Sequence, residues 1–241
     1  MNCASMRRKK IGSQSLMLLP TLLVAFACSQ PAFGVIEEGI SVGFRDFAVL
    51  PNSGSGSSAP ARVNVVTADP LGRLFVNDQR GPLYTMSPDG STVTNYLDLS
   101  SFGGLNVVSS SEQGFQGFAF HPDFANSGAN GFGKFYTIHS EGNTAPAPTF
   151  PFVSNTGSTS FNTHDTLLLE WSVSDPTAAT YAAGGGGAPR EVLRLEQPRS
   201  NHNSGQIAFN RSIGSGNSDY GNLYIAIGDG GSGNDRWTTA R

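Results

Sequence analysis

A single histidine in a short polar turn is the residue of this sequence best placed to do chemistry. His202 lies in the turn 200–205, Ser-Asn-His-Asn-Ser-Gly, directly before the alternating segment 206–209. A second alternating segment, 222–227, runs into a glycine-rich turn that carries Asp229. If the two segments pair as strands, both turns lie at one end of a sheet. An imidazole beside a carboxylate-bearing loop at a strand end can act as a general base, so the sequence predicts an active site there.

The other three histidines are predicted to be structural. His121 lies in His-Pro-Asp-Phe, where Pro122 fixes φ and Asp123 can hydrogen-bond nearby backbone, which is typical of a turn. His139 and His164 lie in or beside segments that read as strands, and nothing around them indicates a chemical role. Asp229 could ligate a metal or cap its own turn, and the turn is favoured.

The segments around these turns predict an all-β fold. The chain has 30 glycines, 14 prolines and 14% charged residues, a mix that favours many short strands over helices. Turn–strand units recur several tens of residues apart, and four short antiparallel strands make one propeller blade or half a sandwich. The segments 143–162 and 182–189 interrupt the pattern and are predicted to be exposed loops. The predicted strands are 62–67, 73–78, 83–86, 92–97, 116–120, 134–139, 166–173, 191–195, 206–209 and 222–227.

Residues 1–34 are predicted to be a signal peptide. A basic run at 7–10 precedes the apolar run 16–27, and a small-x-small sequence ends the segment. Cleavage there predicts an exported protein, periplasmic or secreted. A lipoprotein anchored through Cys28 is the alternative, which a phenylalanine two residues earlier disfavours. The apolar run is shorter than the roughly 20 residues that a membrane span needs.

The predicted mature chain has two parts, an N-terminal strand with a Ser/Gly-rich linker at 35–61 and a propeller-like region at 62–241. Both cysteines, Cys3 and Cys28, lie in the leader, so no disulfide is expected. The leader also holds four of the 15 basic residues and none of the 18 acidic ones, which leaves a net charge of about −7. Such a surface disfavours nucleic acid and anionic membranes as partners.

Three blocks of the sequence resemble the soluble quinoprotein glucose/sorbosone dehydrogenases. These are periplasmic or secreted six-bladed β-propellers of antiparallel four-stranded sheets that use pyrroloquinoline quinone (PQQ) and calcium. The resemblance implies oxidation of an aldose sugar at its anomeric carbon, with electrons passed to an external acceptor. The blocks are 72–76 (GRLFV), 112–124 (EQGFQGFAFHPDF), and 201–206 (NHNSGQ) with 227–231 (IGDGG).

The resemblance implies roles for five residues. His202 falls on the family's general base, which takes the proton of the anomeric hydroxyl as hydride passes to the quinone. Glu112 falls where the family has a Gln or Glu lining the substrate pocket. Asn201 falls beside the base, where some members have Asp, and its amide can position substrate but cannot pair in charge with the imidazole. Asn234 and Asp235 fall on a loop that contacts sugar.

The sequence departs from the family at its end. The residues by which the family holds quinone and calcium would lie beyond Arg241, so none is assigned here. Six blades of about 40–50 residues also need more chain than follows the leader. We therefore expect a fragment: an incomplete ring that holds part of an active site and is inactive alone.

Two other functions stay open from the sequence. A secreted propeller without catalysis could bind a glycan or a protein. A lactonase-like propeller could use a central calcium held by carboxylates, although few acidic residues are placed for it. The stretch 230–235 fits one calcium β-roll repeat, but such rolls need stacked copies, so no metal ligand is assigned.

Overall fold

The computed structural model describes residues 35–36, 40–54, 59–143, 146–152, 164–184 and 187–231. The chain divides into two units, Met1–Arg45 and Asp46–Arg241. In the first unit, β1 (Val35–Ile36) pairs antiparallel with β2 (Ile40–Ser41). The predicted leader, with Cys28, lies outside the described residues. No helix in the described part of the chain is long and apolar enough to cross a membrane.

The larger unit begins with a four-stranded antiparallel sheet whose strands lie in sequence order. Tight turns join them. In the first turn the Asp69 carboxylate accepts the N–H groups of Leu71 and Arg73, each at 2.9 Å, which is why Asp-Pro-Leu-Gly reverses the chain. The strands are β3 (Val63–Ala68), β4 (Leu74–Asp78), β5 (Pro82–Met86) and β6 (Val93–Asp98), and a 3₁₀ turn, η1 (Leu99–Ser101), follows.

A second four-stranded antiparallel sheet follows, again in sequence order. The two interrupting segments are mostly exposed where they are described, yet both are tied to this sheet. Phe150 forms a parallel bridge with Leu195, and Ala183 an antiparallel bridge with Val173. The strands are β7 (Phe115–Phe120), β8 (Lys134–Glu141), β9 (His164–Ser172) and β10 (Arg190–Gln197).

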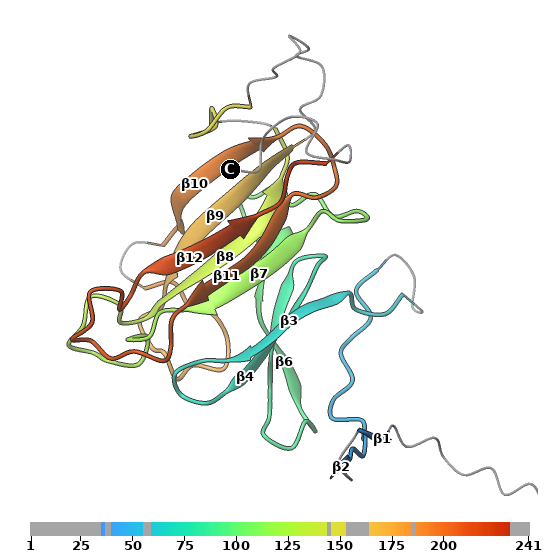
Figure 1. The fold of residues 1–241 in the computed structure, drawn as a ribbon, viewed down its shortest axis with the longest axis vertical. Helices are drawn as coiled ribbons and strands as arrows, with labels where there is room; N and C mark the ends of the chain where they lie inside the picture. The colour runs from blue at the N-terminus through green and yellow to red at the C-terminus, as the bar shows by residue number, and fades with distance from the viewer. Residues whose placement is uncertain are drawn as a thin grey trace, which may run out of the picture. The chain divides into compact units, whose positions relative to one another are not determined.

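A hairpin of β11 (Ser204–Phe209) and β12 (Leu223–Ile227) covers one face of the second sheet. Figure 1 shows the two strands in front of β7, β8 and β9. Ile207 and Phe209 of the hairpin are buried against Ile138 and Leu168 of the sheet. β7 also contacts β3 and β4, so it lies between the first sheet and the hairpin.

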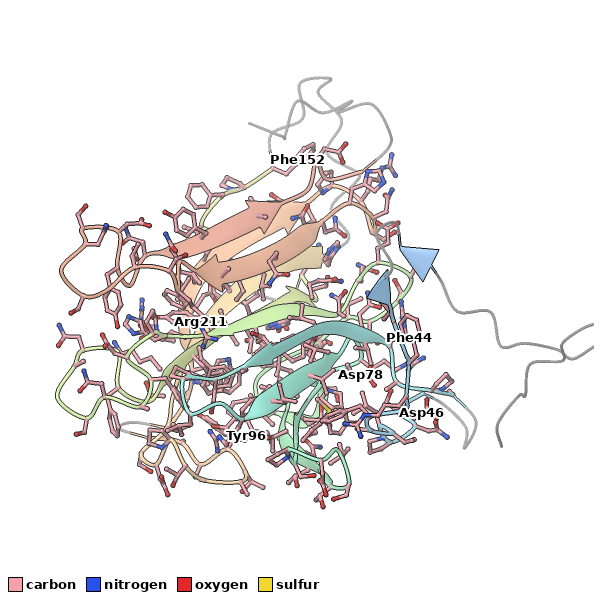
Figure 2. The ribbon with its side chains drawn as sticks, turned by 60° about the horizontal axis from the view of Figure 1, so that its bottom comes forward. Phe44, Asp46, Asp78, Tyr96, Phe152 and Arg211 are labelled. Atoms are coloured by element: carbon pink, nitrogen blue, oxygen red, sulfur yellow. The ribbon has the colours of Figure 1, made fainter. Side chains whose placement is uncertain are left out.

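The main core is aromatic and lies on the other face of the second sheet. Phe75 and Tyr96 of the first sheet meet edge to face at 5.1 Å, and Tyr96 packs against Phe135 of the second. Figure 2 labels Tyr96 where the two sheets meet. Trp171 is fully buried and donates its indole N–H to the Thr137 hydroxyl at 2.8 Å. Aromatic burial of this kind contributes more than area alone and holds the two sheets together.

The structure confirms the all-β class and the antiparallel four-stranded sheets. All ten predicted strands are present, each within two residues of its predicted bounds. They form because alternating β-branched and aromatic residues are separated by Gly, Pro and Asp turns, and both signals are local in sequence.

Candidate functional site

The histidine turn and the glycine-rich turn lie together where β11 begins and β12 ends. Ser204 pairs with Ile227, which brings the residues outside that pair next to each other. His202 has φ 54°, a left-handed conformation that no other described non-glycine residue adopts. Its backbone is held on both sides: the N–H donates to Glu112 Oε2 at 2.7 Å, and the carbonyl accepts the Gly230 N–H at 2.9 Å.

The His202 ring is oriented by a carboxylate. Its Nδ1 lies 3.0 Å from Asp229 Oδ1, the oxygen that also accepts the Gly231 N–H at 2.9 Å. A carboxylate can only accept, so this contact places the ring hydrogen on Nδ1 and leaves Nε2 as the acceptor. The imidazole is 46% exposed and the Asp229 side chain 23% exposed, so a substrate can reach the ring. The geometry is that of a general base oriented by a carboxylate.

Glu112 reaches the site from the loop before β7. Arg62, the residue before β3, donates from its guanidinium to the carbonyls of Ser110 (2.6 Å) and Ser111. The Gln116 amide donates to the carbonyl of Glu112 itself. These bonds hold both ends of the segment Ser110–Glu112 in place. The Glu112 carboxylate lies next to the His202 backbone N–H as a result.

Two glycines allow the turns to approach. A Cβ on Gly228 would overlap the carbonyl of His202. Gly231 has φ 88°, and a Cβ there would overlap the side chain of Asn201. Only glycine fits at such close backbone contacts. Asn201 therefore lies against the Asp229 turn.

The structure brings together three of the five predicted site residues: His202, Glu112 and Asn201. Asn234 and Asp235 lie outside the described residues. Asp229, interpreted from the sequence as a turn residue, does cap its turn, but it also orients the imidazole. The sequence feature that indicates this role is the position of Asp229 just after β12. β12 pairs with β11, and β11 begins just after His202.

Beneath the histidine turn, the second sheet ends in buried polar side chains. His164 and His139 are fully buried, and His139 Nε2 lies 3.0 Å from Glu141 Oε2. Burial lowers the pKa of His164 to about 4, with the neighbouring Asn203 side chain acting in the opposite direction. Both histidines were predicted to be structural, and both are fully buried, which the sequence did not indicate.

The low pKa of His164 makes stability depend on pH. The ordinary value is 6.5 and the folded value about 4, so below pH 6.5 the unfolded chain takes up a proton that the folded chain does not. The contribution of His164 to the free energy of unfolding is fully present above pH 6.5. It falls by roughly 3 kcal/mol as the pH drops to about 4. Denaturant unfolding across this range should show a flatter pH dependence for His164→Gln than for wild type. Equal slopes in the two proteins would contradict it.

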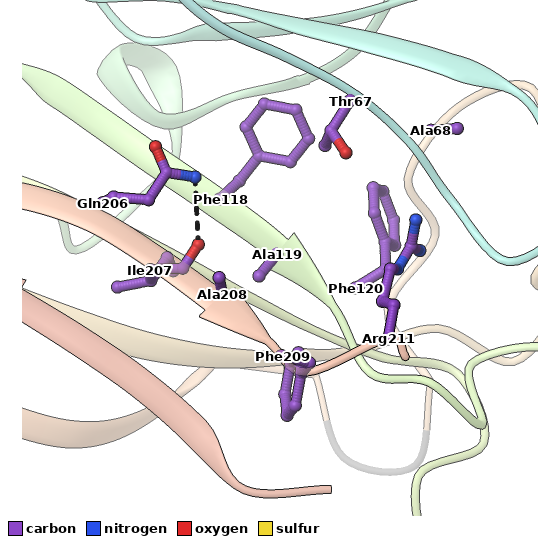
Figure 3. A pocket seen from close by; sticks show the side chains of 10 residues that line it. All are labelled: Thr67, Ala68, Phe118, Ala119, Phe120, Gln206, Ile207, Ala208, Phe209 and Arg211. Carbon is purple, nitrogen blue, oxygen red and sulfur yellow. Dashed lines mark hydrogen bonds between the residues drawn. The ribbon is translucent and has the colours of Figure 1, made fainter. Parts of the chain in front are cut away.

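A small cavity opens elsewhere, between β3, β7 and β11. It holds about 80 Å³. Its lining includes Thr67, Phe118, Gln206 and Arg211, which Figure 3 labels. Pockets for small ligands usually hold about 300–1,000 Å³. This cavity is too small for a sugar and does not include His202.

No protein-family model matches this chain. Among solved structures, the chain is similar to an oxidoreductase from Thermus thermophilus that is designated a glucose dehydrogenase. The two share 15% sequence identity with a TM-score of 0.41, over 70% of this chain and 37% of that protein. A second protein described as a glucose dehydrogenase shares 16% identity with a TM-score of 0.44, over 71% of this chain and 41% of its own. The chain thus spans about two fifths of the length of these proteins.

Proposed function

We propose that the full-length protein is an exported sugar dehydrogenase that oxidises an aldose at its anomeric carbon. His202 is the general base, PQQ the immediate electron acceptor and calcium a further cofactor. One observation carries the proposal: the His202 ring is oriented through Nδ1 by Asp229, while its backbone is held by Glu112. The sequence blocks that resemble the quinoprotein dehydrogenases supply the reaction class.

The proposed proton transfer uses the free nitrogen of the ring. Nε2 accepts the proton of the anomeric hydroxyl while the hydrogen on C1 leaves with its electron pair. The sugar thereby loses two electrons and one carbonyl forms, so an aldopyranose becomes a lactone. Asp229 keeps the ring hydrogen on Nδ1 throughout and offsets the positive charge that the ring gains. A positioned base of this kind contributes about 10²–10⁴-fold to a rate.

Substrate contacts are assigned to Glu112 and Asn201. Oε2 of Glu112 is taken by the His202 N–H, which leaves Oε1 to accept a sugar hydroxyl. The Asn201 amide, against the Asp229 turn, can donate to a second hydroxyl. Asn234 and Asp235 are proposed as further sugar contacts on the basis of the resemblance.

The quinone, when bound, would supply a two-electron acceptor, and an external acceptor would reoxidise it. Across the described ranges, no three His, Cys, Asp or Glu side chains converge as metal ligands. No described side chain is therefore assigned as a calcium ligand, and none is assigned to the quinone. Both stay proposals.

We also propose that the sheets belong to a six-bladed propeller. β7 is the first strand of the second sheet. It contacts β3, the first strand of the first sheet, and β11, the first strand of the hairpin. In a propeller, the blades are arranged around a central axis, so the first strands of successive blades lie next to one another. In that arrangement His202 and Glu112 come from neighbouring blades.

Turnover tests the function directly. The full-length protein, expressed with any sequence that flanks these 241 residues, is incubated with PQQ, calcium and glucose or another aldose, and dye reduction is followed. We expect reduction that requires both the quinone and the sugar. Hydrolysis of lactones with calcium alone would instead establish a lactonase. Glycan binding with no quinone uptake would establish a binding protein, and either result would overturn the proposal.

A further inference from the structure

The residue after the proposed base is an asparagine that the structure buries almost completely. Asn203 is 3% exposed, whereas its neighbour His202 is exposed to solvent. The Asn203 amide nitrogen donates to the carbonyl of Arg199 at 2.7 Å and to Gln197 Oε1 at 3.3 Å. The side chain therefore points into the protein while that of its neighbour points out.

These bonds tie the histidine turn to the second sheet. Gln197 ends β10, and its own amide donates to the Thr166 hydroxyl of β9 at 2.8 Å. The fully buried His164, also on β9, lies beside the Asn203 side chain. Asn203 is thus tied to β10 through Gln197 and to the segment after β10 through Arg199, and not only to its own turn.

The backbone of Asn203 is also bonded to the glycine-rich turn that carries Asp229. Its carbonyl accepts the Gly228 N–H at 2.7 Å, next to the Gly230 N–H bond to His202. Gly228 and Gly230 flank Asp229. One residue therefore anchors the turn that carries the imidazole and the turn that carries the carboxylate.

We infer that Asn203 is a positioning residue that sets the His202 ring against Asp229. The inference rests on the proposed function, in which His202 is the base. A non-glycine residue in a left-handed conformation costs about 1–3 kcal/mol and persists only where its surroundings over-determine it. Glu112 and Gly230 hold the His202 backbone from outside, and the buried amide of Asn203 holds the next residue from inside. Without that amide the turn relaxes and the Nδ1–Oδ1 contact is lost.

The tautomer of His202 reports this positioning independently of activity. The chain has four histidines, so two-bond ¹H–¹⁵N spectra of protein labelled with ¹⁵N-histidine are simple, and His202→Gln assigns the signal. Above neutral pH we expect the Nδ1–H form in wild type, because Asp229 accepts that hydrogen. In Asn203→Ala the Nδ1–H population should fall several-fold toward the Nε2–H form that is ordinarily favoured.

Thr137→Val is the matched control, because it removes the buried hydrogen bond to Trp171 of the same sheet at a site remote from the turn. It should lower stability and leave the His202 spectrum unchanged. If Asn203→Ala does not fold, Gln197→Met removes one of the two acceptors and should shift the tautomer in the same direction by less. Wild-type Nδ1–H populations in the folded variants would overturn the inference.

In the active protein, Asn203→Ala should lower kcat by about 10–100-fold with little change in KM, as expected when a reacting group is misplaced. The two proposals fail separately. A wild-type protein without turnover but with an Asn203-dependent tautomer would refute the sugar dehydrogenase and leave the positioning intact. A loss of kcat with an unchanged tautomer would refute the positioning alone.

Discussion

Replacing His202 with glutamine should lower kcat for aldose oxidation by about 10²–10⁴-fold, with a smaller change in KM. Glutamine has a similar size and can still hydrogen-bond to Asp229 and a sugar hydroxyl, but it cannot accept a proton. The loss therefore isolates the proton transfer from binding. Steady-state dye reduction by the full-length protein measures it, and retained turnover in the variant would refute the role of the imidazole.

Asp229→Asn tests the same step without touching the ring. The asparagine amide can donate to Nδ1, which favours the tautomer with its hydrogen on Nε2, where the base must accept. We expect a loss of kcat comparable to that of His202→Gln and little further loss in the double variant, because the two residues act as one unit. His121→Gln is the matched control: His121 lies in the turn after β7, and its Nδ1 accepts the Asp123 N–H at 3.0 Å. Its kcat should equal that of wild type.

The strands could be predicted from the sequence because their signals are local. Period-two alternation and Gly, Pro and Asp turns act over a few residues, and most of the ten strands followed from them. β9 shows where the pattern weakens. Residues 164–169 are all buried because both faces of the strand are covered, by the core on one side and the hairpin on the other. A strand of this kind reads as a continuous run without alternation.

The partners of the site could be predicted only in part. Glu112 lies 90 positions before His202, and the sequence connected them through a family resemblance rather than through any local pattern. The turn that carries Asp229 was expected beside the histidine turn, but Asp229 was interpreted only as a turn residue, because its contact with the imidazole depends on the register of β11 and β12. That register shifts by a bulge between Ser204 and Ile207, which no local signal announces.

Side chains that bond across the fold were the hardest to predict. The turn at His121 was predicted correctly, but Asp123 was expected to bond nearby backbone. Its carboxylate instead accepts the hydroxyl of Tyr220 at 2.9 Å, from the long β11–β12 loop. The burial of Asn203 is similar: it points inward, away from its neighbour His202, because Gln197 of β10 and the carbonyl of Arg199 accept its amide hydrogens.

Replacing Arg194 with methionine should lower the free energy of unfolding by about 3–5 kcal/mol. Arg194 Nη1 lies 3.0 Å from Asp165 Oδ2 with both side chains almost fully buried, and Nη2 lies 2.9 Å from Glu191. Burial raises the pKa of Asp165, and the hydrogen bond and charge of Arg194 act in the opposite direction. Without the arginine, a carboxylate stays buried with no cation beside it, so it must take up a proton or draw water into the sheet.

The same substitution four residues earlier in the strand supplies the control. Arg190 also pairs with a carboxylate, Glu170 at 3.0 Å, but its side chain is 63% exposed. Arg190→Met should therefore cost less than about 1 kcal/mol. Denaturant unfolding compares the two, and Asp165→Asn added to Arg194→Met should recover most of the loss, because the amide carries no charge to bury. If Arg194→Met proves no more destabilising than Arg190→Met, the buried pair does not hold this end of the sheet together.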